Sequence, residues 1–274
     1  MRGAPPPAIA FIGGGNMASA LIGGLCRSGQ AADSVLVVDP GVEQRRTLER
    51  QFGVRTQAAA DAALAGAALV VWAVKPQMFV EAAAPCAPFV PASLNLSVMA
   101  GIRCDAIARA TGATRIVRSM PYTPALIGRG IAGLYATATV SAAERARVEQ
   151  VLAPTGQTLW VERESDLDAV TALSGSGPAY VFYFVEAMIA AAVEMGLTDA
   201  QGKRLALATF DGATALAAQS DDPPALLRER VTSKGGTTHA ALQSLAADGV
   251  ADAVVRAVRA AQRRAAELGD EYGR

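Results

Sequence analysis

The segment "TSKGGTTHAAL" (232–242) gathers two glycines, two threonines and the chain's single histidine where a helix is about to begin. Glycines leave the first backbone N–H groups of a helix unobstructed, and these donors together with the helix dipole form an anion-binding site. One cap residue is enough to start a helix, so the cluster of Gly235, Gly236, Thr237 and Thr238 indicates a bound anion. The alternative is that both threonines are ordinary N-cap residues.

A second glycine cluster stands near the start of the chain, in "AFIGGGNMASALIGGL". It carries Gly13-x-Gly15-x-x-Ala18 directly after an apolar run and ahead of a helical segment. Such glycines allow a tight turn and a close approach to a pyrophosphate, which the helix N-terminus stabilises. Asp39 ends the next apolar run, about where a ribose-binding carboxylate is expected. The pattern predicts a dinucleotide site, and a purely structural glycine turn is the alternative.

The charged residues that follow this motif leave the choice of cofactor open. Asp39 suits the hydroxyl groups of an adenosine ribose, which favours NAD. Arg45 and Arg46 follow closely and could instead receive the 2′-phosphate of NADP, or belong to a solvated helix face. The sequence therefore predicts NAD or NADP, in its reduced form as the hydride donor.

Two further strand-like runs end in "AVKP" (73–76) and "SVMAGI" (97–102). Doubly wound sheets bind ligands at the carboxyl ends of their strands, so these ends are expected beside the nicotinamide. The alternative for Lys75 is an ordinary surface lysine. The expected cofactor-binding residues are Gly13, Gly14, Gly15, Asn16, Met17, Asp39, Val74, Lys75, Pro76 and Ala100.

The amino-acid composition argues against several classes of protein. Lys and Arg number 25 and Asp and Glu number 25, so no net charge attracts nucleic acid or an anionic membrane surface. Three distant cysteines fit reduced thiols better than disulfides or a metal site. The Pro-rich start lacks the continuous apolar core of a signal peptide. "AYVFYFVEAMIAAAVEMGL" comes closest to a membrane span, but two glutamates interrupt it. We expect a cytoplasmic protein.

The elements that must position these residues change character along the chain. The runs 8–12, 35–39, 69–74, 94–98 and 115–119 are continuously apolar, as strands covered on both faces are, and 131–135 and 158–161 extend the sheet. Segments 16–28, 43–52 and 77–87 are the expected crossover helices. This alternation predicts an α/β fold, a Rossmann-type doubly wound sheet over residues 1–163.

An all-helical dimerisation and substrate domain is expected over residues 164–274, with helices at 178–195, 199–218, 223–231, 238–247 and 250–268. Thr198-Asp-Ala-Gln201 is a capping-box pattern. The helices 178–195 and 199–218 are apolar nearly all round and must be buried on every side. One small domain cannot bury two such helices, so we expect a homodimer that interlocks them.

Five motifs together, "FIGGGNMA", "AVKPQ", "RSMPYTPALIGRG", "LSGSGPAYVFYF" and "VTSKGGTTHAAL", resemble pyrroline-5-carboxylate reductases over nearly the whole chain. The resemblance implies reduction of L-1-pyrroline-5-carboxylate to L-proline by NAD(P)H, in a dimer that can assemble further. It also implies that the Thr238 hydroxyl hydrogen-bonds the ring nitrogen as the catalytic contact, that Gly235, Gly236 and Thr237 hold the carboxylate, and that Glu164 lies near the substrate. No metal is implied.

The chain departs from the family pattern at two positions. Tyr122 stands where the family usually has Asn, and Lys234 stands where it usually has Pro. Neither change removes a group that the chemistry needs. His239 directly follows Thr238, so its side chain points about 100° away along a helix, and we expect no role for it.

Two other functions remain as alternatives. A related imine or β-hydroxyacid reductase would need a catalytic lysine in the second domain, and its candidate, Lys203, has a surface-like context in "QGKRL". A non-catalytic dinucleotide sensor would not need the Gly-Gly-Thr-Thr cluster. Glu164 could also be a solvated charge, and "LSGSGPAY" (173–180) could serve either packing or the site.

Overall fold

The structure is a computed structural model that describes residues 7–272. Residues 1–6, which hold most of the Pro-rich start in which we expect no signal peptide, lie outside the described residues, as do 273–274 at the end of the second predicted domain. The described chain divides into two compact units, one of residues 7–175 and 261–272 and one of 176–260. The chain thus divides after Gly175 and again at Ala261, and not at the functional boundary predicted at 163/164. That functional boundary stays a prediction.

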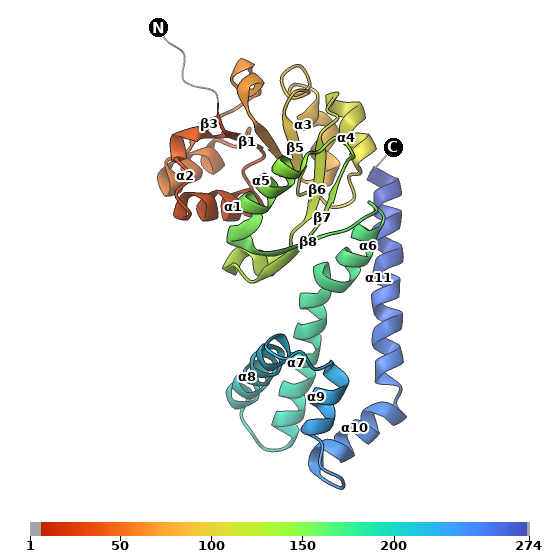
Figure 1. Ribbon diagram of the computed structural model, residues 1–274. Coiled ribbons are helices and arrows are strands. Elements are labelled where there is room, and N and C mark those ends of the chain that lie inside the picture. Colours follow the sequence, from red (N-terminus) through yellow and green to blue (C-terminus); the bar gives the residue numbers. More distant parts are fainter. Residues whose placement is uncertain (1–6, 273–274) are drawn as a thin grey trace. The chain divides into compact units, whose positions relative to one another are not determined.

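The first unit contains an eight-stranded sheet with the order β3-β2-β1-β4-β5-β6-β7-β8 (Figure 1). Only β7 runs antiparallel to its neighbour β6, and β8 is again parallel to β7. The Rossmann-type fold is therefore confirmed. The strands are β1 Ile9–Ile12, β2 Val35–Val38, β3 Arg55–Gln57, β4 Leu69–Trp72, β5 Leu94–Ser97, β6 Ile116–Met120, β7 Gly130–Ala136 and β8 Gly156–Trp160.

Both faces of this sheet are covered, which explains the continuously apolar strands. Alternate residues of one strand enter two separate cores: Phe11 lies in the first core, and Ala10 and Ile12 lie in the second. Val37 and Leu36 divide in the same way. Because each side chain is buried whichever way it points, no polar alternation remains in β1, β2 or β4.

Helices of the first unit follow most of its strands. The predicted helix 77–87 is shorter, as a 3₁₀ turn and the brief helix α3, and prolines at 85 and 88 follow it. The helices are α1 Asn16–Arg27, α2 Val42–Phe52, α3 Phe79–Ala83, α4 Cys104–Thr111, α5 Ala142–Leu152 and α6 Asp166–Val170 with a π-helical turn at Thr171–Gly175; 3₁₀ turns are Ala32–Ser34, Ala62–Gly66, Pro76–Met78, Thr123–Ile127 and Ala153–Thr155.

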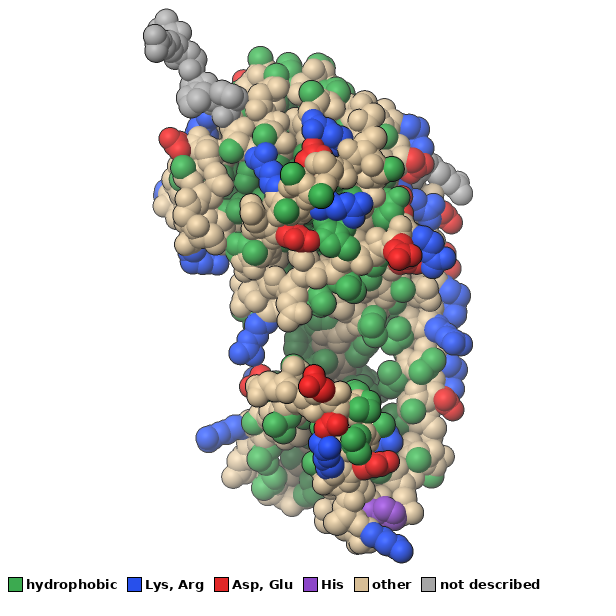
Figure 2. All heavy atoms as spheres, in the orientation of Figure 1, with side chains coloured by type: hydrophobic (Ala, Val, Ile, Leu, Met, Phe, Trp, Pro, Cys, Tyr) green, Lys and Arg blue, Asp and Glu red, His purple; other side chains and the backbone are tan. Residues whose placement is uncertain are grey.

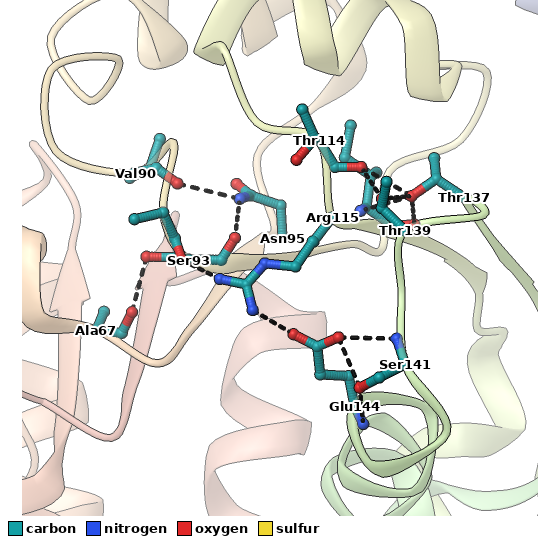
Figure 3. Close-up of polar contacts among 12 residues, drawn as sticks. Ala67, Val90, Ser93, Asn95, Thr114, Arg115, Thr137, Thr139, Ser141 and Glu144 are labelled. Carbon is teal, nitrogen blue, oxygen red and sulfur yellow. Dashed lines mark hydrogen bonds and ion pairs between the residues drawn. The ribbon is translucent and has the colours of Figure 1, made fainter.

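A polar network joins the amino ends of β5 and β6 to the start of α5 (Figure 3). The Arg115 guanidinium forms an ion pair with Glu144 and donates to the carbonyl of Ala92. Glu144 also accepts from the backbone N–H of Ser141 at 2.9 Å, which completes the capping box of α5. These bonds tie the segments before β5 and β6 to the start of α5, which is a structural role.

The second unit is helical, as predicted. It contains α7 Gly177–Glu194, α8 Asp199–Ala218, α9 Pro224–Arg230, α10 Thr237–Ala247 and the first part of α11 Val250–Tyr272. The expected capping box is present, since the Thr198 hydroxyl accepts from the Gln201 N–H at 3.2 Å and the Gln201 side chain accepts from the Thr198 N–H at 2.8 Å.

The last turns of α11 belong to the first unit. Arg103, at the start of α4, forms an ion pair with Asp270 at 2.6 Å. A Cβ on Gly101 would lie 3.0 Å from the Tyr272 ring, so the absence of a side chain at Gly101 lets this ring approach. The chain therefore leaves the first unit after Gly175 and returns to it at Ala261.

In the single chain, α7 and α8 are largely exposed, although their composition predicts burial on every side. The continuous helical run Asp166–Glu194 is long and apolar enough to cross a membrane by length and composition alone, which is weak evidence for a span. Figure 2 shows part of the apolar surface of this unit. Its exposed apolar residues include Val181, Phe182, Tyr183, Met188, Val193, Leu205, Leu207 and Leu216.

Candidate active site

The turn between β1 and α1 carries the first glycine cluster. Gly13 has φ +94°, and a Cβ there would lie 2.8 Å from the carbonyl oxygen of Ala73. A Cβ on Gly14 would lie 2.8 Å from the Leu48 side chain, whereas no described atom lies within 4 Å of one on Gly15. Gly13 is thus required by packing against the backbone, Gly14 lies against the Leu48 side chain, and Gly15 leaves the start of α1 open.

The first turn of α1 fits an anion. Gly15 is the N-cap residue and supplies no side-chain cap bond. The backbone N–H groups of the first helical residues, which include Asn16 and Met17, therefore have no partner within the helix. The helix dipole adds a partial positive charge at the same place.

A cavity of about 460 Å³ opens beside this turn, at the carboxyl ends of β1, β2 and β4. It lies within the first unit, and its lining reaches from the turn after β4 to the segment after β3. The lining comprises residues 12–15, 38–40, 58–60 and 73–75 with Met78, Glu81, Ala82, Pro85 and Cys86.

The structure brings most predicted cofactor-binding residues to this cavity. Gly13, Gly14, Gly15, Asp39, Val74 and Lys75 all line it. Asn16 and Met17 begin α1 next to the lining, and Pro76 begins the 3₁₀ turn that follows Lys75. Ala100 follows β5 and is not among the lining residues. Each binding role stays a prediction.

The Asp39 carboxylate holds the rim of the cavity together. Its Oδ2 accepts from the Gly14 N–H at 2.8 Å, and its Oδ1 accepts from the Gly41 N–H at 2.7 Å. The side chain therefore fixes the glycine turn in addition to facing the cavity.

Sequence reasoning missed the residues on the far side of the cavity. Glu81 and Cys86 line it because α3 and the turn after it fold back toward β1. Burial raises the pKa of the Cys86 thiol to about 11, so this side chain is a neutral, apolar wall near pH 7. No local motif marks either residue, since their position depends on the path of the chain after β4.

The second glycine cluster, in the second unit, forms a β-turn followed by α10. The Gly236 N–H donates to the Ser233 carbonyl at 3.0 Å, and Gly235 at the third position has φ +74°. These features define a type II turn, in which the second position, here Lys234, favours proline. The family's usual Pro at this position is explained by the turn, and Lys234 still allows it.

The start of α10 is open. Gly236 is the N-cap residue without a side-chain cap bond, so neither Thr237 nor Thr238 caps the helix from that position. Thr237 is exposed and Thr238 half-buried. His239, the purple side chain in Figure 2, is partly exposed one residue further along. The threonine hydroxyls are therefore available for a ligand, while the substrate-binding roles stay predictions.

Glu164 belongs to the first unit and has strong partners there. Its Oε1 forms an ion pair with Arg118 at 2.7 Å and accepts from the Cys104 N–H at 2.7 Å. The Arg118 side chain is buried, with 7% exposed. Glu164 is thus neither simply solvated nor an uncompensated negative charge, and its predicted place near the substrate stays a prediction.

Tyr122 is buried after β6, where it packs on the π-helical turn of "LSGSG". A Cβ on Gly175 would lie 2.3 Å from the Tyr122 ring, so the tyrosine requires glycine at that position. Burial raises the pKa of its phenol, against the effect of the nearby Ser174 and Thr171 hydroxyls. This departure is accommodated by packing, and "LSGSG" has a packing role at Gly175.

Comparison with known proteins agrees with this arrangement. Residues 8–101 match the family model "NADP oxidoreductase coenzyme F420-dependent", and residues 164–268 match "Pyrroline-5-carboxylate reductase dimerisation". The chain is 44% identical to the pyrroline-5-carboxylate reductase of Pseudomonas aeruginosa, over 97% of this chain and 98% of the relative. It is 34% identical to the Escherichia coli enzyme, over 95% and 97%.

Solved structures give the same result. A pyrroline-5-carboxylate reductase from Coxiella burnetii has a TM-score of 0.90 at 32% identity, covering 96% of this chain and 99% of that one. The Plasmodium falciparum enzyme, solved with NADP bound, has a TM-score of 0.83 at 27% identity, covering 97% and 100%.

The fold and the cavity define a Rossmann-type oxidoreductase that depends on NAD(P). Its second part carries a dimerisation domain, which supports self-association. The chain belongs to the pyrroline-5-carboxylate reductase family.

Proposed function

We propose that this chain reduces L-1-pyrroline-5-carboxylate to L-proline with NAD(P)H, the last step of proline biosynthesis. The observation that carries the proposal is a glycine turn and cavity of the dinucleotide-binding type in a chain 44% identical, over 97% of its length, to a pyrroline-5-carboxylate reductase. The substrate is a cyclic imine that carries a carboxylate.

The reaction requires little acid–base catalysis from the protein. When bound, the reduced nicotinamide supplies the hydride, and a protonated imine is already electrophilic. The chain's own residues must hold both molecules in a reactive orientation and exclude water. Because the cofactor and the protonated imine supply the reactivity, the sequence motifs of the site need no His–Asp pair.

For the cofactor, the open start of α1 suits the pyrophosphate, because free N–H groups and the helix dipole favour an anion there. Asp39 faces the cavity as an acceptor for ribose hydroxyls. Val74, Lys75, Pro76 and Ala100 follow β4 and β5, the strand ends at which the nicotinamide is expected.

For the substrate, the open start of α10 suits the carboxylate. The backbone N–H groups of Gly236 and Thr237 lie at that start, although the Gly236 N–H is already used by the turn. We assign the remaining N–H groups to the carboxylate, the Thr238 hydroxyl to the ring nitrogen, and Glu164 to the surroundings of the substrate. A threonine hydroxyl can both donate and accept, so Thr238 fits either protonation state of the nitrogen.

We further propose that two copies bury the apolar surfaces of α7 and α8 against one another. Phe182 and Tyr183 are 60% and 71% exposed in the single chain, and the dimerisation match covers both helices. A partner protomer, rather than lipid, would then cover the helical run Asp166–Glu194. Size-exclusion chromatography at micromolar concentration should give a dimer or larger, and a monomer would refute the arrangement.

The test of the reaction is direct. Purified protein is incubated with pyrroline-5-carboxylate and NADH or NADPH, and absorbance of the reduced cofactor is followed. Loss of absorbance with equimolar formation of proline supports the proposal. Cofactor binding without turnover would favour a dinucleotide sensor, and turnover of other imines alone would favour a related reductase. We expect the reaction in the cytoplasm, with no nucleic acid or membrane as partner.

A further inference from the structure

We propose that this chain prefers NADH to NADPH and that Asp39 is the residue that sets the preference. The inference rests on the proposed function for its physiological meaning, but it concerns cofactor affinity and can be measured separately. The two cofactors differ only in the 2′-phosphate on the adenosine ribose, so the charge of the cavity wall after β2 decides between them.

The Asp39 carboxylate is fixed in place at this wall. It lines the cavity while its two oxygens accept from the backbone N–H groups of Gly14 and Gly41. Rotation away from a phosphate would break both bonds, and the Gly14 bond supports the glycine turn itself. An ionised carboxylate only accepts hydrogen bonds, so it can bind a ribose hydroxyl but repels a phosphate.

The two arginines that could reverse this preference have other partners. Arg45 donates through Nη1 to the backbone carbonyl of Asp39 at 2.7 Å and to that of Pro40 at 2.9 Å. Arg46 is paired with Glu43 at 2.9 Å, and its side chain is 63% exposed. Neither arginine is among the described residues that line the cavity.

The other charges of the lining do not compensate Asp39. Glu81 adds a second carboxylate, and Lys75 is the one cation among the described lining residues. Lys75 follows β4 and Asp39 follows β2, and these strands flank β1 on opposite sides. Two strand spacings separate their ends by roughly 10 Å, so Lys75 is placed for the other half of the dinucleotide.

Direct binding tests the inference without the imine substrate. Dissociation constants for NADH and NADPH are measured by fluorescence titration of the purified full chain at fixed ionic strength. We expect NADH to bind at least about tenfold more tightly, since a like-charge contact costs at least that much. Equal affinities, or tighter binding of NADPH, would overturn the proposal.

The variants Asp39→Asn and Asp39→Ser identify the residue responsible. Both remove the charge, and Asp39→Asn keeps one acceptor for the glycine turn. Each should lower the NADH-to-NADPH affinity ratio by about tenfold, mainly by tightening NADPH. Thermal melting shows which variant is folded. A folded variant that keeps the wild-type affinity ratio would show that Asp39 does not set the cofactor preference.

Two further variants serve as controls. Asp105→Asn removes one exposed carboxylate of the same unit, paired with Arg109 on α4 and away from the cavity, and should leave the ratio unchanged. Arg45→Ala should leave NADPH binding nearly unchanged. Selective loss of NADPH affinity in Arg45→Ala would show that this arginine binds the phosphate and would overturn the proposal.

The outcomes separate this inference from the proposed reaction. A chain that binds NADH preferentially but does not reduce pyrroline-5-carboxylate keeps the inference and loses the proposed function. A chain that forms proline but binds NADPH more tightly keeps the function and loses the inference.

Discussion

Two of the helices that begin at glycines, α1 and α10, carry the candidate cofactor and substrate sites, and these two openings differ in what requires the glycine. At the start of α1, Gly13 combines φ +94° with a contact that a Cβ would make at 2.8 Å to a backbone carbonyl. At the start of α10, Gly235 has φ +74°, and no described atom lies within 4 Å of such a Cβ. Packing and conformation both fix the first glycine, whereas conformation alone fixes the second.

The two openings are therefore held in place differently. The first is held by the surrounding chain, because Val38 of β2, Ala73 after β4 and Leu48 of α2 lie against its glycines, so it presents a preformed surface. The second stands on a turn of its own and keeps its groups accessible. Changes at the first opening should lower stability, and changes at the second should mainly lower activity.

Gly13→Ala should be the most damaging of these changes. It should lower the free energy of unfolding by about 2–4 kcal/mol, because a positive φ and a backbone clash add together. Urea denaturation measures it. Gly15→Ala is the matched control, since Gly15 has φ −66° and open space, and should cost less than about 1 kcal/mol. Equal losses in the two variants would contradict the conclusion that positive φ and the Ala73 carbonyl fix Gly13.

Thr238→Ala comes next, through its effect on turnover. We expect kcat to fall by about 10- to 100-fold, the loss of one good hydrogen bond in the transition state, with unfolding unchanged. Steady-state kinetics with pyrroline-5-carboxylate measure it. Ser244→Ala removes an exposed hydroxyl further along α10 and should keep wild-type turnover. Unchanged kinetics in a folded Thr238→Ala dimer would refute the catalytic contact.

Substitutions at Gly235 should lower stability less, and they separate the cost of a positive φ from the cost of a steric clash. Gly235→Ala should cost about 1 kcal/mol of stability from the positive φ alone. Gly235→Asn should recover part of this loss, because asparagine tolerates the left-handed region. At Gly13 the same asparagine should recover nothing, since the Ala73 carbonyl still blocks its Cβ. Thermal melts of the four variants decide whether the two glycines differ as described.

Lys234→Pro should give a small gain in stability. It places proline at the second position of the type II turn, where its fixed φ suits the turn. We expect about 0.4–1 kcal/mol of stabilisation through the unfolded state. The hydrogen bond that closes the turn is unaffected, because it joins Ser233 and Gly236. A loss of stability measured in urea would contradict the assignment of the turn.

The sequence predicted the elements whose signal is local. Strands with continuous apolar residues, such as β1 and β4, were located within two residues, and the capping box at Thr198 was correct. β3 escaped prediction because Arg55–Gln57 is polar and half-buried at the edge of the sheet. α5 was also missed, although Ser141 and Glu144 form a capping-box pattern that marks its start.

The candidate site divides in the same way. The glycine motifs and Asp39 can be recognised in the sequence because backbone conformation and spacing are local properties. Glu81 and Cys86 join the cavity only through the fold, so no local pattern identifies them. The Glu164–Arg118 ion pair joins residues 46 positions apart for the same reason.

The return of α11 to the first unit has a consequence for synthesis. Asp270, which pairs with Arg103, and Tyr272, whose ring lies against Gly101, are translated only after the entire helical unit. A nascent sheet domain on the ribosome therefore exposes this docking surface until the last turns of α11 emerge, and the first unit is complete only then.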